Sequence, residues 1–540
     1  MKKYIPILLV LCLFSVMAFH YPYQVFMDEF SSYGSGMKLY KYSHFANIWV
    51  THGIINPYIT EASAYILGES ESFMASRIAN GIIGLFTVIA AYLLARKLFD
   101  EKVAILSGVF LMSSPYFIVS SHRELSDNPA TLFFILTLLA FVRYWEKQDT
   151  KNLFILSFFF SLSLASKLTV GPYFAIIIFL LFLKNRFKLK ESFTPSLLFV
   201  LFTGLLFFMI FPHTLLYFRD FYNEFMGFQI SRTGNDIDPF RTGEIKNFLS
   251  GYKFYYSELK EFGFPYIVMV LSFLGIIYYS ISLLKKNSSS DDLKKLIVFL
   301  PAAFGFLFYG SFNSYYMRYL MPIFPLIAIS AAAFTFSMLR EKLKKYIIPV
   351  TLLKIITCGI IIFSLLFNFR LIWKINEVKK RRTEFFDLAH KIKQYEKKGD
   401  IIVFDFPQGF TFDSSNFGHP YGAYPLMMSG IDEKTILVYP PASAIHPEKF
   451  DILITTNEIS DEKLMLIDEV SPPAEMEDEI LAIEFGSKER YKELLNTNPS
   501  YVEKQIHFME KEGGGYPTRF FIYTTKEQSK VKRESSASSG

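Results

Sequence analysis

Residues 153–184 read LFILSFFFSLSLASKLTVGPYFAIIIFLLFLK, two apolar runs separated by a short stretch that contains Lys167. A helix that crosses a hydrocarbon layer about 30 Å thick needs about 20 apolar residues, or somewhat fewer where flanking side chains extend to the membrane surface. The two runs, near 153–170 and 172–184, meet that requirement. The stretch therefore predicts two neighbouring transmembrane helices.

Runs of the same kind recur on both sides of this stretch, up to residue 370, so the sequence predicts about eleven transmembrane helices in all. Besides the two above, they lie near 4–20, 75–95, 103–121, 129–145, 195–212, 264–284, 296–312, 319–338 and 347–367. The first run follows Lys2 and Lys3. We interpret it as a retained span, because further spans follow and no convincing A-x-A cleavage site is present.

The composition fits a membrane protein and argues against two other classes. Hydrophobic residues make up 51% of the 540 residues, with 60 Phe and 33 Tyr, which is more apolar surface than a soluble protein needs. The net charge is +6, and Lys and Arg form short clusters between apolar runs, a pattern of membrane topology and not of a nucleic-acid surface. The two cysteines, Cys12 and Cys358, lie in apolar runs, so we expect neither a disulfide framework nor a cysteine-based zinc site.

Basic residues in the short loops predict the orientation of the chain in the membrane. One set of loops is rich in Lys and Arg, near 2–3, 96–102, 143–151, 184–190, 285–295 and 340–345, whereas the alternate loops near 122–127, 167–172 and 313–318 are not. We therefore expect a cytoplasmic N-terminus, with the long loops 21–74 and 213–263 and everything after 368 on the extracytoplasmic side. The basic cluster at 370–382 opposes this orientation, but long translocated domains often escape the charge rule.

From residue 371 the composition changes, and the sequence predicts a small extracytoplasmic α/β domain over 371–529. Helices are expected at 383–398 and 488–495, strands at 401–404, 436–439 and 452–455, and a hairpin at 502–509 and 518–525. The Ser-rich, charged end at 530–540 is predicted to be disordered. The expected fold is an α-helical polytopic membrane domain over 1–370, with interfacial helices in its outward-facing loops, followed by this α/β domain.

Two groups of charged residues lie where the chain leaves the membrane on the predicted outward side. Asp28 and Glu29 follow the first span, and paired carboxylates can divide the work of proton transfer and substrate positioning. The short loop 122–127 contains Arg123, Glu124 and Asp127 between two apolar helices, where charges are costly unless they are paired or face water. Each group is open to an ordinary interpretation, a solvated loop in the first case and a hydrophilic turn with an Arg123–Glu124 ion pair in the second. The functional interpretation makes them two walls of one active site.

Several short motifs occur in a recognisable order over residues 1–370. They are Asp28-Glu29, Asn56-Pro57-Tyr58, Leu67-Gly68-Glu69-Ser70, Ser76-Arg77-Ile78-Ala79-Asn80-Gly81, Leu93–Phe99, Ser113-Ser114-Pro115, the 123–127 cluster, Ala165-Ser166-Lys167 and Arg318-Tyr319-Leu320-Met321-Pro322. In this order and spacing the chain resembles the dolichyl-phosphate-mannose protein mannosyltransferase and aminoarabinose lipid A transferase group, within the C superfamily of glycosyltransferases. Enzymes of this family move a sugar from a polyprenyl-phosphate carrier to an acceptor on the outer face of the membrane, without a nucleotide donor.

The resemblance implies roles for individual residues. Asp28 resembles the family's catalytic base, Glu29 the neighbouring acid that holds acceptor or sugar, and Asp127 a second acidic position across the cavity. The cations that resemble contacts to the carrier phosphate or sugar are Arg77, Arg123, Lys167 and Arg318, since fixed positive charge stabilises a leaving phosphate. Possible contacts to acceptor or sugar are Glu124, His52 and Asn56. Arg77 and Arg318 are equally open to a role as interfacial anchors.

Two departures from the family bear on these expectations. Many relatives carry His-Pro-Pro or Lys-Pro in the first loop, where this chain has Asn56-Pro57 with His52 four residues earlier. A related branch, the oligosaccharyltransferases, uses a metal held by loop carboxylates and a Trp-Trp-Asp motif, whereas Trp49, Trp145 and Trp373 are not adjacent here. We predict no catalytic metal and no other cofactor, because the lipid-linked sugar is a substrate.

The leading prediction is an inverting membrane glycosyltransferase whose partners are a polyprenyl-phosphate sugar, a protein, lipid or polymer acceptor, and membrane lipids. A multi-span transporter or lipid flippase would also have buried charges, but it should carry broken helices near mid-membrane and related halves, and the sequence shows neither clearly. A non-catalytic membrane scaffold with a sensing domain would leave the placement of 28–29 and 123–127 unexplained. The sugar, the carrier lipid and the acceptor are not readable from the sequence.

Overall fold

The structure is a computed structural model of the whole chain. It describes residues 27–46, 48, 53–121, 123–233, 252, 255–256, 259, 263–283, 289–311, 317–337, 384–395, 400–405, 436–439, 450–455, 459–471, 488–497, 499 and 520–525, with scattered helical positions between 355 and 373. The predicted spans at 4–20 and 347–367 lie wholly or largely outside the described residues, as do the tail 530–540, His52 and His122.

The chain divides into two compact units, which we describe separately. The first comprises residues 1–20, 35–62 and 74–374, and the second comprises 21–34, 63–73 and 375–540. The predicted domain limits at 370 and 529 stay predictions.

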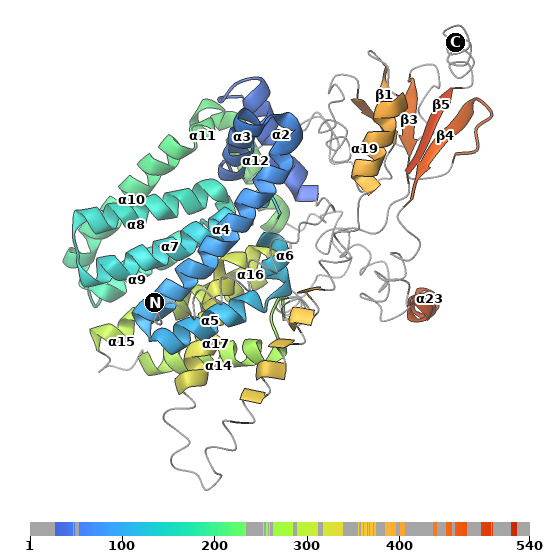
Figure 1. The fold of residues 1–540 in the computed structure, drawn as a ribbon. Coiled ribbons are helices and arrows are strands. Elements are labelled where there is room, and N and C mark those ends of the chain that lie inside the picture. The colour runs from blue at the N-terminus through green and yellow to red at the C-terminus, as the bar shows by residue number, and fades with distance from the viewer. Residues whose placement is uncertain are drawn as a thin grey trace. The chain divides into compact units, whose positions relative to one another are not determined.

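The described part of the first unit is helical (Figure 1). Three helices, α2, α3 and α4, are divided between the two units. The elements are α2 (Met27–Lys41), α3 (Ile55–Leu67), α4 (Glu69–Leu98), α5 (Glu101–Met112), α6 (Pro115–Ser121), α7 (Asp127–Glu146), α8 (Thr150–Ser166), η2 (Leu168–Val170), α9 (Tyr173–Lys184), α10 (Leu189–Ile210), α11 (His213–Leu216), α12 (Phe218–Thr233), α14 (Tyr266–Leu283), α15 (Ser290–Lys294), α16 (Leu296–Gly310), η4 (Met317–Ile323) and α17 (Phe324–Ser337).

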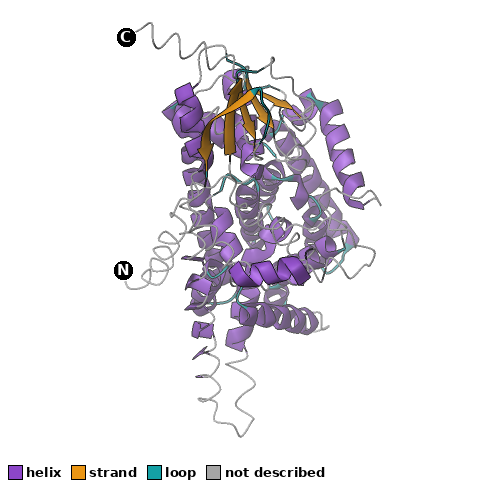
Figure 2. Ribbon diagram, turned by 90° about the vertical axis from the view of Figure 1, so that its right-hand side faces the viewer, coloured by secondary structure: helices purple, strands orange, loops and turns teal. Residues whose placement is uncertain are grey.

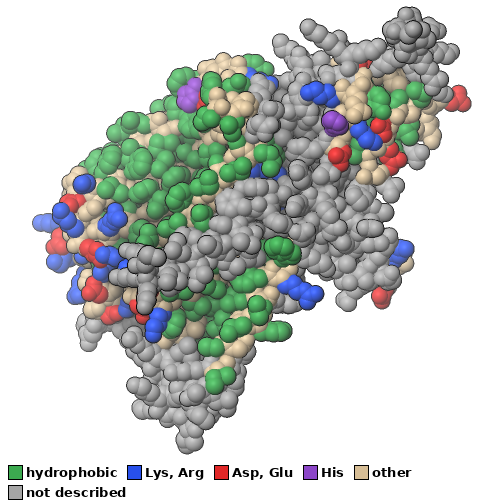
Figure 3. Space-filling view, viewed as in Figure 1, with side chains coloured by type: hydrophobic (Ala, Val, Ile, Leu, Met, Phe, Trp, Pro, Cys, Tyr) green, Lys and Arg blue, Asp and Glu red, His purple; other side chains and the backbone are tan. Residues whose placement is uncertain are grey.

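Within the described residues, five helical segments are long and apolar enough to cross a membrane, and the bent pair α5–α6 makes a sixth if it counts as one span. Helices such as α8 and α14 are apolar but shorter. Large apolar side chains are exposed on the outside of the bundle, among them Phe86 on α4, Phe158 on α8 and Met209 on α10. Figure 3 shows the hydrophobic side chains spread over this face, as expected of a surface that contacts lipid. The chain is therefore an integral membrane protein, while the total of about eleven spans stays a prediction.

The predicted span over 103–121 is not one continuous helix in the structure. The helix ends at Met112, and α6 starts at Pro115 after a bend of 76°. Pro115 has no backbone N–H and its ring excludes a continuous helix, and it also disfavours helical geometry at Ser114. The Ser114 hydroxyl instead accepts a hydrogen bond from Phe117 N (3.2 Å), so the Ser-Pro pair ends one helix and begins the next.

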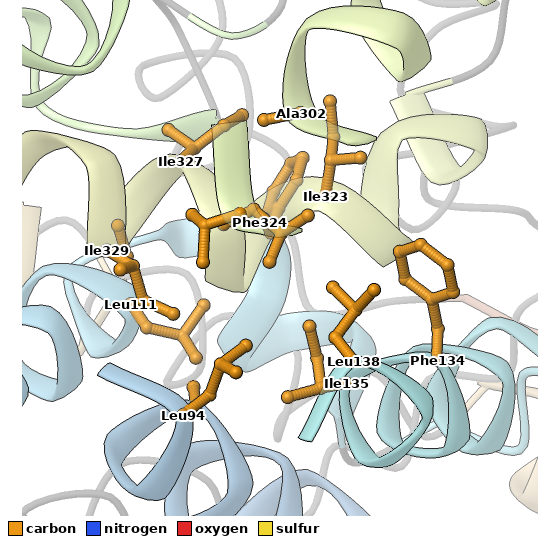
Figure 4. Packing of buried hydrophobic residues seen from close by; sticks show 14 of the residues in the cluster. Leu94, Leu111, Phe134, Ile135, Leu138, Ala302, Ile323, Phe324, Ile327 and Ile329 are labelled. Carbon is orange, nitrogen blue, oxygen red and sulfur yellow. The ribbon is translucent and has the colours of Figure 1, made fainter. Parts of the chain in front are cut away.

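Helix α7 lies in the core of the bundle, packed against several other helices. Figure 4 shows Phe134, Ile135 and Leu138 of α7 packed near Leu94 of α4 and Phe324 of α17. Polar contacts join the helices as well: Ser163 Oγ of α8 donates to Ala130 O of α7 (2.8 Å). Small side chains and hydroxyls at helix contacts are the usual means of association in lipid, where apolar surface alone gives no driving force.

The second unit contains a five-stranded sheet in the order β2-β1-β3-β5-β4 (Figure 2). The strands are β1 (Ile402–Asp405), β2 (Ile436–Tyr439), β3 (Ile452–Thr455), β4 (Leu464–Val470) and β5 (Phe520–Thr525). β1 pairs in parallel with β2 and β3, whereas β5 runs antiparallel to β3 and β4. The strands β1, β2, β3 and β5 lie where the sequence predicted strands. The partner predicted for β5, residues 502–509, lies outside the described residues.

Helix α19 (Glu384–Tyr395) packs against β4 of this sheet. Lys391 Nζ donates to Asp468 Oδ1 (2.6 Å) and Tyr395 Oη to Asp468 Oδ2 (3.0 Å). Burial opposes ionisation of Asp468, but these partners and the Glu469 N–H together hold the pKa of its carboxyl below the usual range. The predicted second helix is also present, as α23 (Lys488–Thr497).

Candidate active site

The predicted base and its neighbour lie at the start of a helix. Asp28 and Glu29 occupy the first turn of α2, but their side chains lie outside the described residues. Their meeting with the 123–127 turn therefore stays a prediction, and the site is built here from the first unit alone.

The turn before α7 is buried, although it is rich in charge. Arg123, Glu124 and Asp127 are each at most 2% exposed, so the turn is shielded from solvent, while the two interpretations, an Arg123–Glu124 ion pair and one wall of an active site, stay predictions. The backbone folds tightly here, since Leu125 N donates to Arg123 O (2.8 Å) and Asn128 N to Leu125 O (3.1 Å). Buried charges persist only where partners replace water, and each of these three side chains has interaction partners.

Asp127 forms an ion pair with Lys167, forty residues along the chain. Lys167 Nζ lies 2.6 Å from both carboxylate oxygens of Asp127, and the side chains of Lys167 and Asp127 are 6% and 3% exposed. Asp127 belongs to the first turn of α7 and Lys167 caps the end of α8. The ammonium also lies 5.8 Å from the centroid of the Tyr319 ring in η4, within cation–π range. Helices α7 and α8 and the 3-10 helix η4 thus bring a carboxylate, an ammonium group and an aromatic ring together.

Three asparagines connect this turn to the start of α3. The Asn128 amide donates to Ser120 O (2.8 Å), Arg123 O (2.9 Å) and Asn80 Oδ1 (3.2 Å). The Asn80 amide in turn donates to Asn56 Oδ1 (3.4 Å). All three are buried, and Asn56 Nδ2 has no hydrogen-bond partner in the part of the chain that the structure describes. Asn56 was predicted as a contact, Asn80 was quoted only as part of a motif, and Asn128 was not singled out from the sequence.

The segment just before α3 also docks directly on the end of α8. Ile54 N donates to Ala165 O (2.7 Å). Gly53 adopts φ +73°, and a Cβ there would collide with Ser166 O, so only glycine allows this approach. The start of α3 is therefore held beside Lys167.

Two further buried charges are Glu124, in the turn, and Arg77, on α4. Thr60 of α3 donates its hydroxyl to Glu124 Oε1 and contacts Ser76 Oγ (3.1 Å). Arg77, the next residue on α4, is fully buried and has interaction partners, and both roles predicted for it, phosphate contact and interfacial anchor, stay predictions. Arg318 is half-buried in η4, next to Tyr319.

A second polar cluster, which the sequence analysis missed, joins the loop before α3 to α11. His44 Nδ1 contacts both oxygens of the Glu61 carboxylate (2.9 and 3.1 Å), and its ring stacks on Tyr58 (5.0 Å between centroids). The His44 carbonyl accepts a hydrogen bond from His213 Nε2 (3.1 Å). Isolated histidines and a single glutamate give no spacing signal in sequence, which explains why the cluster was not found.

Burial sets the protonation of two members of this cluster. It raises the pKa of Tyr58 to about 12, with a further contribution from the Glu61 charge. For His213, burial has the opposite effect and lowers the pKa. The hydrogen bond to the His44 carbonyl raises this pKa in part, and the charge of the His44 ring lowers it slightly further. His213 is therefore neutral at pH 7, with its proton on Nε2.

Across the residues that the structure describes, no three His, Cys, Asp or Glu side chains are arranged to hold a metal ion. Asp28 and Glu29 are not among those side chains, and the expectation of metal-independent chemistry stays a prediction.

Comparison with known families gives one match. Residues 51–215 match the family described as dolichyl-phosphate-mannose-protein mannosyltransferase. That range includes Asn56, Arg77, the 123–127 turn and Lys167, but not Arg318. No curated protein matches the chain with significance.

Solved structures share the fold. ArnT from Cupriavidus metallidurans, bound to undecaprenyl phosphate, is similar with a TM-score of 0.54 and 14% identity, over 86% of this chain and 93% of that one. AglB from Archaeoglobus fulgidus, an archaeal oligosaccharyltransferase in complex with an inhibitory peptide and a dolichol-phosphate, is similar with a TM-score of 0.55 and 10% identity, over 97% and 88%. At such identities the likeness concerns the fold. Together with the family match, it confirms the resemblance to the C superfamily of membrane glycosyltransferases.

Proposed function

We propose that this chain is a membrane glycosyltransferase that moves a sugar from a polyprenyl-phosphate carrier to an acceptor on the extracytoplasmic face. The observation that carries the proposal is the buried Asp127–Lys167 pair beside Tyr319, inside the stretch that matches a family of sugar transferases. The structures with the same fold hold undecaprenyl phosphate or dolichol-phosphate, which supports a carrier of that class.

The proposed reaction is a single displacement with inversion at the anomeric carbon. The acceptor oxygen forms a bond to that carbon while the bond from the carbon to the carrier phosphate oxygen breaks. Asp28 takes the acceptor proton, and Glu29 holds the acceptor or sugar. The bond electrons leave with the phosphate, which gains a negative charge.

Cations beside the leaving group lower the barrier, because charge that develops in a low-dielectric site is stabilised strongly by fixed opposite charge. Lys167 is the first candidate, followed by Arg77, Arg123 and Arg318. Glu124, Asn56 and His52 are proposed to contact the acceptor or sugar. The acceptor is a protein, a lipid or an envelope polymer, and the sugar a hexose or pentose.

The bend between α5 and α6 favours a second candidate, a transporter or lipid flippase. A broken span is a feature of transporters, and the sequence analysis had not expected one. A transporter would move the lipid-linked sugar without forming a new glycosidic bond.

The test is sugar transfer by the purified chain in detergent from radiolabelled polyprenyl-phosphate sugars. We expect Asp28→Asn to reduce turnover by about 100-fold or more, the usual contribution of a general base. Asp220→Asn, on the exposed start of α12 in the other long loop, is the matched control and should retain wild-type turnover. Equal activity of Asp28→Asn and the control would rule out Asp28 as the base, and carrier binding without any transfer would favour the transporter.

A further inference from the structure

Lys167 has a negative partner within the protein itself. Its ammonium contacts both oxygens of Asp127, and the pair is almost completely shielded from solvent. The pair is neutral as a unit. A phosphate that approached it unchanged would meet the Asp127 carboxylate as well as the Lys167 ammonium, and like charges repel strongly where water is excluded.

The Lys167 side chain can move more easily than the Asp127 side chain. Lysine carries its charge on a flexible four-carbon stem with rotatable donors, and Lys167 lies just beyond α8, with extended backbone dihedral angles (φ −160°, ψ 121°). Asp127 lies in the first turn of α7, and the preceding Ser126 makes no side-chain capping hydrogen bond. The positive end of the helix dipole therefore favours the Asp127 carboxylate whether or not Lys167 is paired with it.

We propose that Asp127 is the resident counterion of Lys167 and that the carrier phosphate displaces it, so that Lys167 exchanges a carboxylate for a phosphate when the carrier binds. This inference rests on the proposed function. Asp127 is then a positioning residue that opposes carrier binding, in contrast to a group that contacts the sugar or moves a proton. The Tyr319 ring lies within cation–π distance of the ammonium and stabilises its charge during the exchange.

The exchange also gives the site a way to release its product. When the bond from the sugar to the phosphate breaks, the carrier phosphate gains a charge and holds Lys167 more tightly. Asp127 remains nearby as a competing anion, and it recaptures Lys167 when the spent carrier leaves.

The test measures binding of farnesyl phosphate, a short polyprenyl monophosphate, to the full chain in detergent, with farnesol as the probe that lacks the phosphate. We expect Lys167→Met to weaken farnesyl phosphate binding by about tenfold or more, and Asp127→Asn to strengthen it by a similar factor, the range of close charge pairs. Farnesol binding should change in neither variant. A direct contact between Asp127 and the carrier, or a merely structural role, predicts weaker binding by Asp127→Asn.

A matched control lies at the opposite end of α8, where Asp149 pairs with Lys147 (3.1 Å) on the surface. Asp149→Asn should leave farnesyl phosphate binding unchanged. If Asp127→Asn does not fold, the doubly neutral variant Asp127→Asn/Lys167→Met removes both buried charges together. The double variant should bind farnesyl phosphate more tightly than Lys167→Met does. In Lys167→Met the Asp127 carboxylate is still present and repels the phosphate.

The outcomes separate the two proposals. If the wild type transfers sugar and binds farnesyl phosphate, but Asp127→Asn or the double variant binds it no better than its parent, the exchange is wrong and the proposed function stands. If the wild type neither binds farnesyl phosphate in preference to farnesol nor transfers sugar, the proposed function itself fails.

Discussion

The two ends of α7 carry the same kind of ion pair in different surroundings. At the N-terminal end, Asp127 pairs with Lys167 and the carboxylate side chain is 3% exposed. At the C-terminal end, Glu146 pairs with Lys97 (3.0 Å) and Lys294 (3.4 Å), and its side chain is 36% exposed. Exposed pairs contribute little because water and salt screen them, whereas a buried pair is weak evidence for stability and points to a retained role. We therefore expect a functional role for the buried pair and an ordinary solvated surface at the other end.

The largest effect expected from this comparison is on sugar transfer. Lys167→Met should lower turnover by about 100-fold, the loss typical when one charge-stabilising group is removed from a transition state. The matched change at the exposed end, Lys294→Met, should leave turnover within about twofold. Both are measured with radiolabelled carrier sugar. Equal losses in the two variants would remove the functional distinction between the ends of the helix.

The next effect concerns the asparagine that holds the buried turn. Asn128→Ala removes hydrogen bonds to Ser120 O and Arg123 O and should lower the free energy of unfolding by about 2 kcal/mol, because buried acceptors lose their partner. Gln148→Ala, which removes the exposed contact to Asn185 (3.1 Å) just beyond the other end of α7, is the control and should change stability by less than about 0.5 kcal/mol. Thermal unfolding in detergent measures both. A stable Asn128→Ala with full turnover would show that the turn needs no such support.

A smaller, pH-dependent effect extends the contrast of buried and exposed groups to the histidines. His213 is buried and its pKa is lowered, so the unfolded chain binds a proton at a higher pH than the folded chain does. Stability from this group is present above the unfolded pKa of about 6.5 and is lost as the pH falls through the folded value. Protonation would add an N–H at Nδ1, which has no acceptor among the described residues.

The measurement is the melting temperature of the wild type and of His213→Gln at pH 7.5 and pH 5.5. We expect the wild type to lose about 2–4 °C more than His213→Gln on acidification. His44 is half-exposed, and its carbonyl is the hydrogen-bond partner of His213. His44→Gln should therefore keep more of the wild-type pH dependence of the melting temperature than His213→Gln does. Identical acid shifts in wild type and His213→Gln would exclude His213 as the source.

The smallest effect is expected at the exposed end of α7. Glu146→Gln breaks two ion pairs but should change the free energy of unfolding by less than about 1 kcal/mol, and the difference should shrink further at high salt. A large loss of stability in Glu146→Gln would show that this network is more than a solvated surface.

Sequence reasoning performed differently on different elements. The apolar runs of α7 and α10 were located closely because a membrane span is a local property of about 20 residues. Strand β4 was missed because its register shifts between Leu466 and Asp468 and its side chains do not alternate cleanly between buried and exposed. The break before Pro115 was also missed, since the apolar pattern continues across it.

By itself the sequence determined that the chain crosses a membrane repeatedly, that charges gather in a few short turns, and that its motifs resemble a family of sugar transferases. These conclusions depend on residues near one another along the chain. Only the tertiary structure decided that the 123–127 turn is buried, that Lys167 is the partner of Asp127, and that Asn56, Asn80 and Asn128 form one chain of hydrogen bonds. The reason is physical: solvation and pairing of a charge depend on whichever helix packs beside it, and the partners here lie 24 to 48 residues apart.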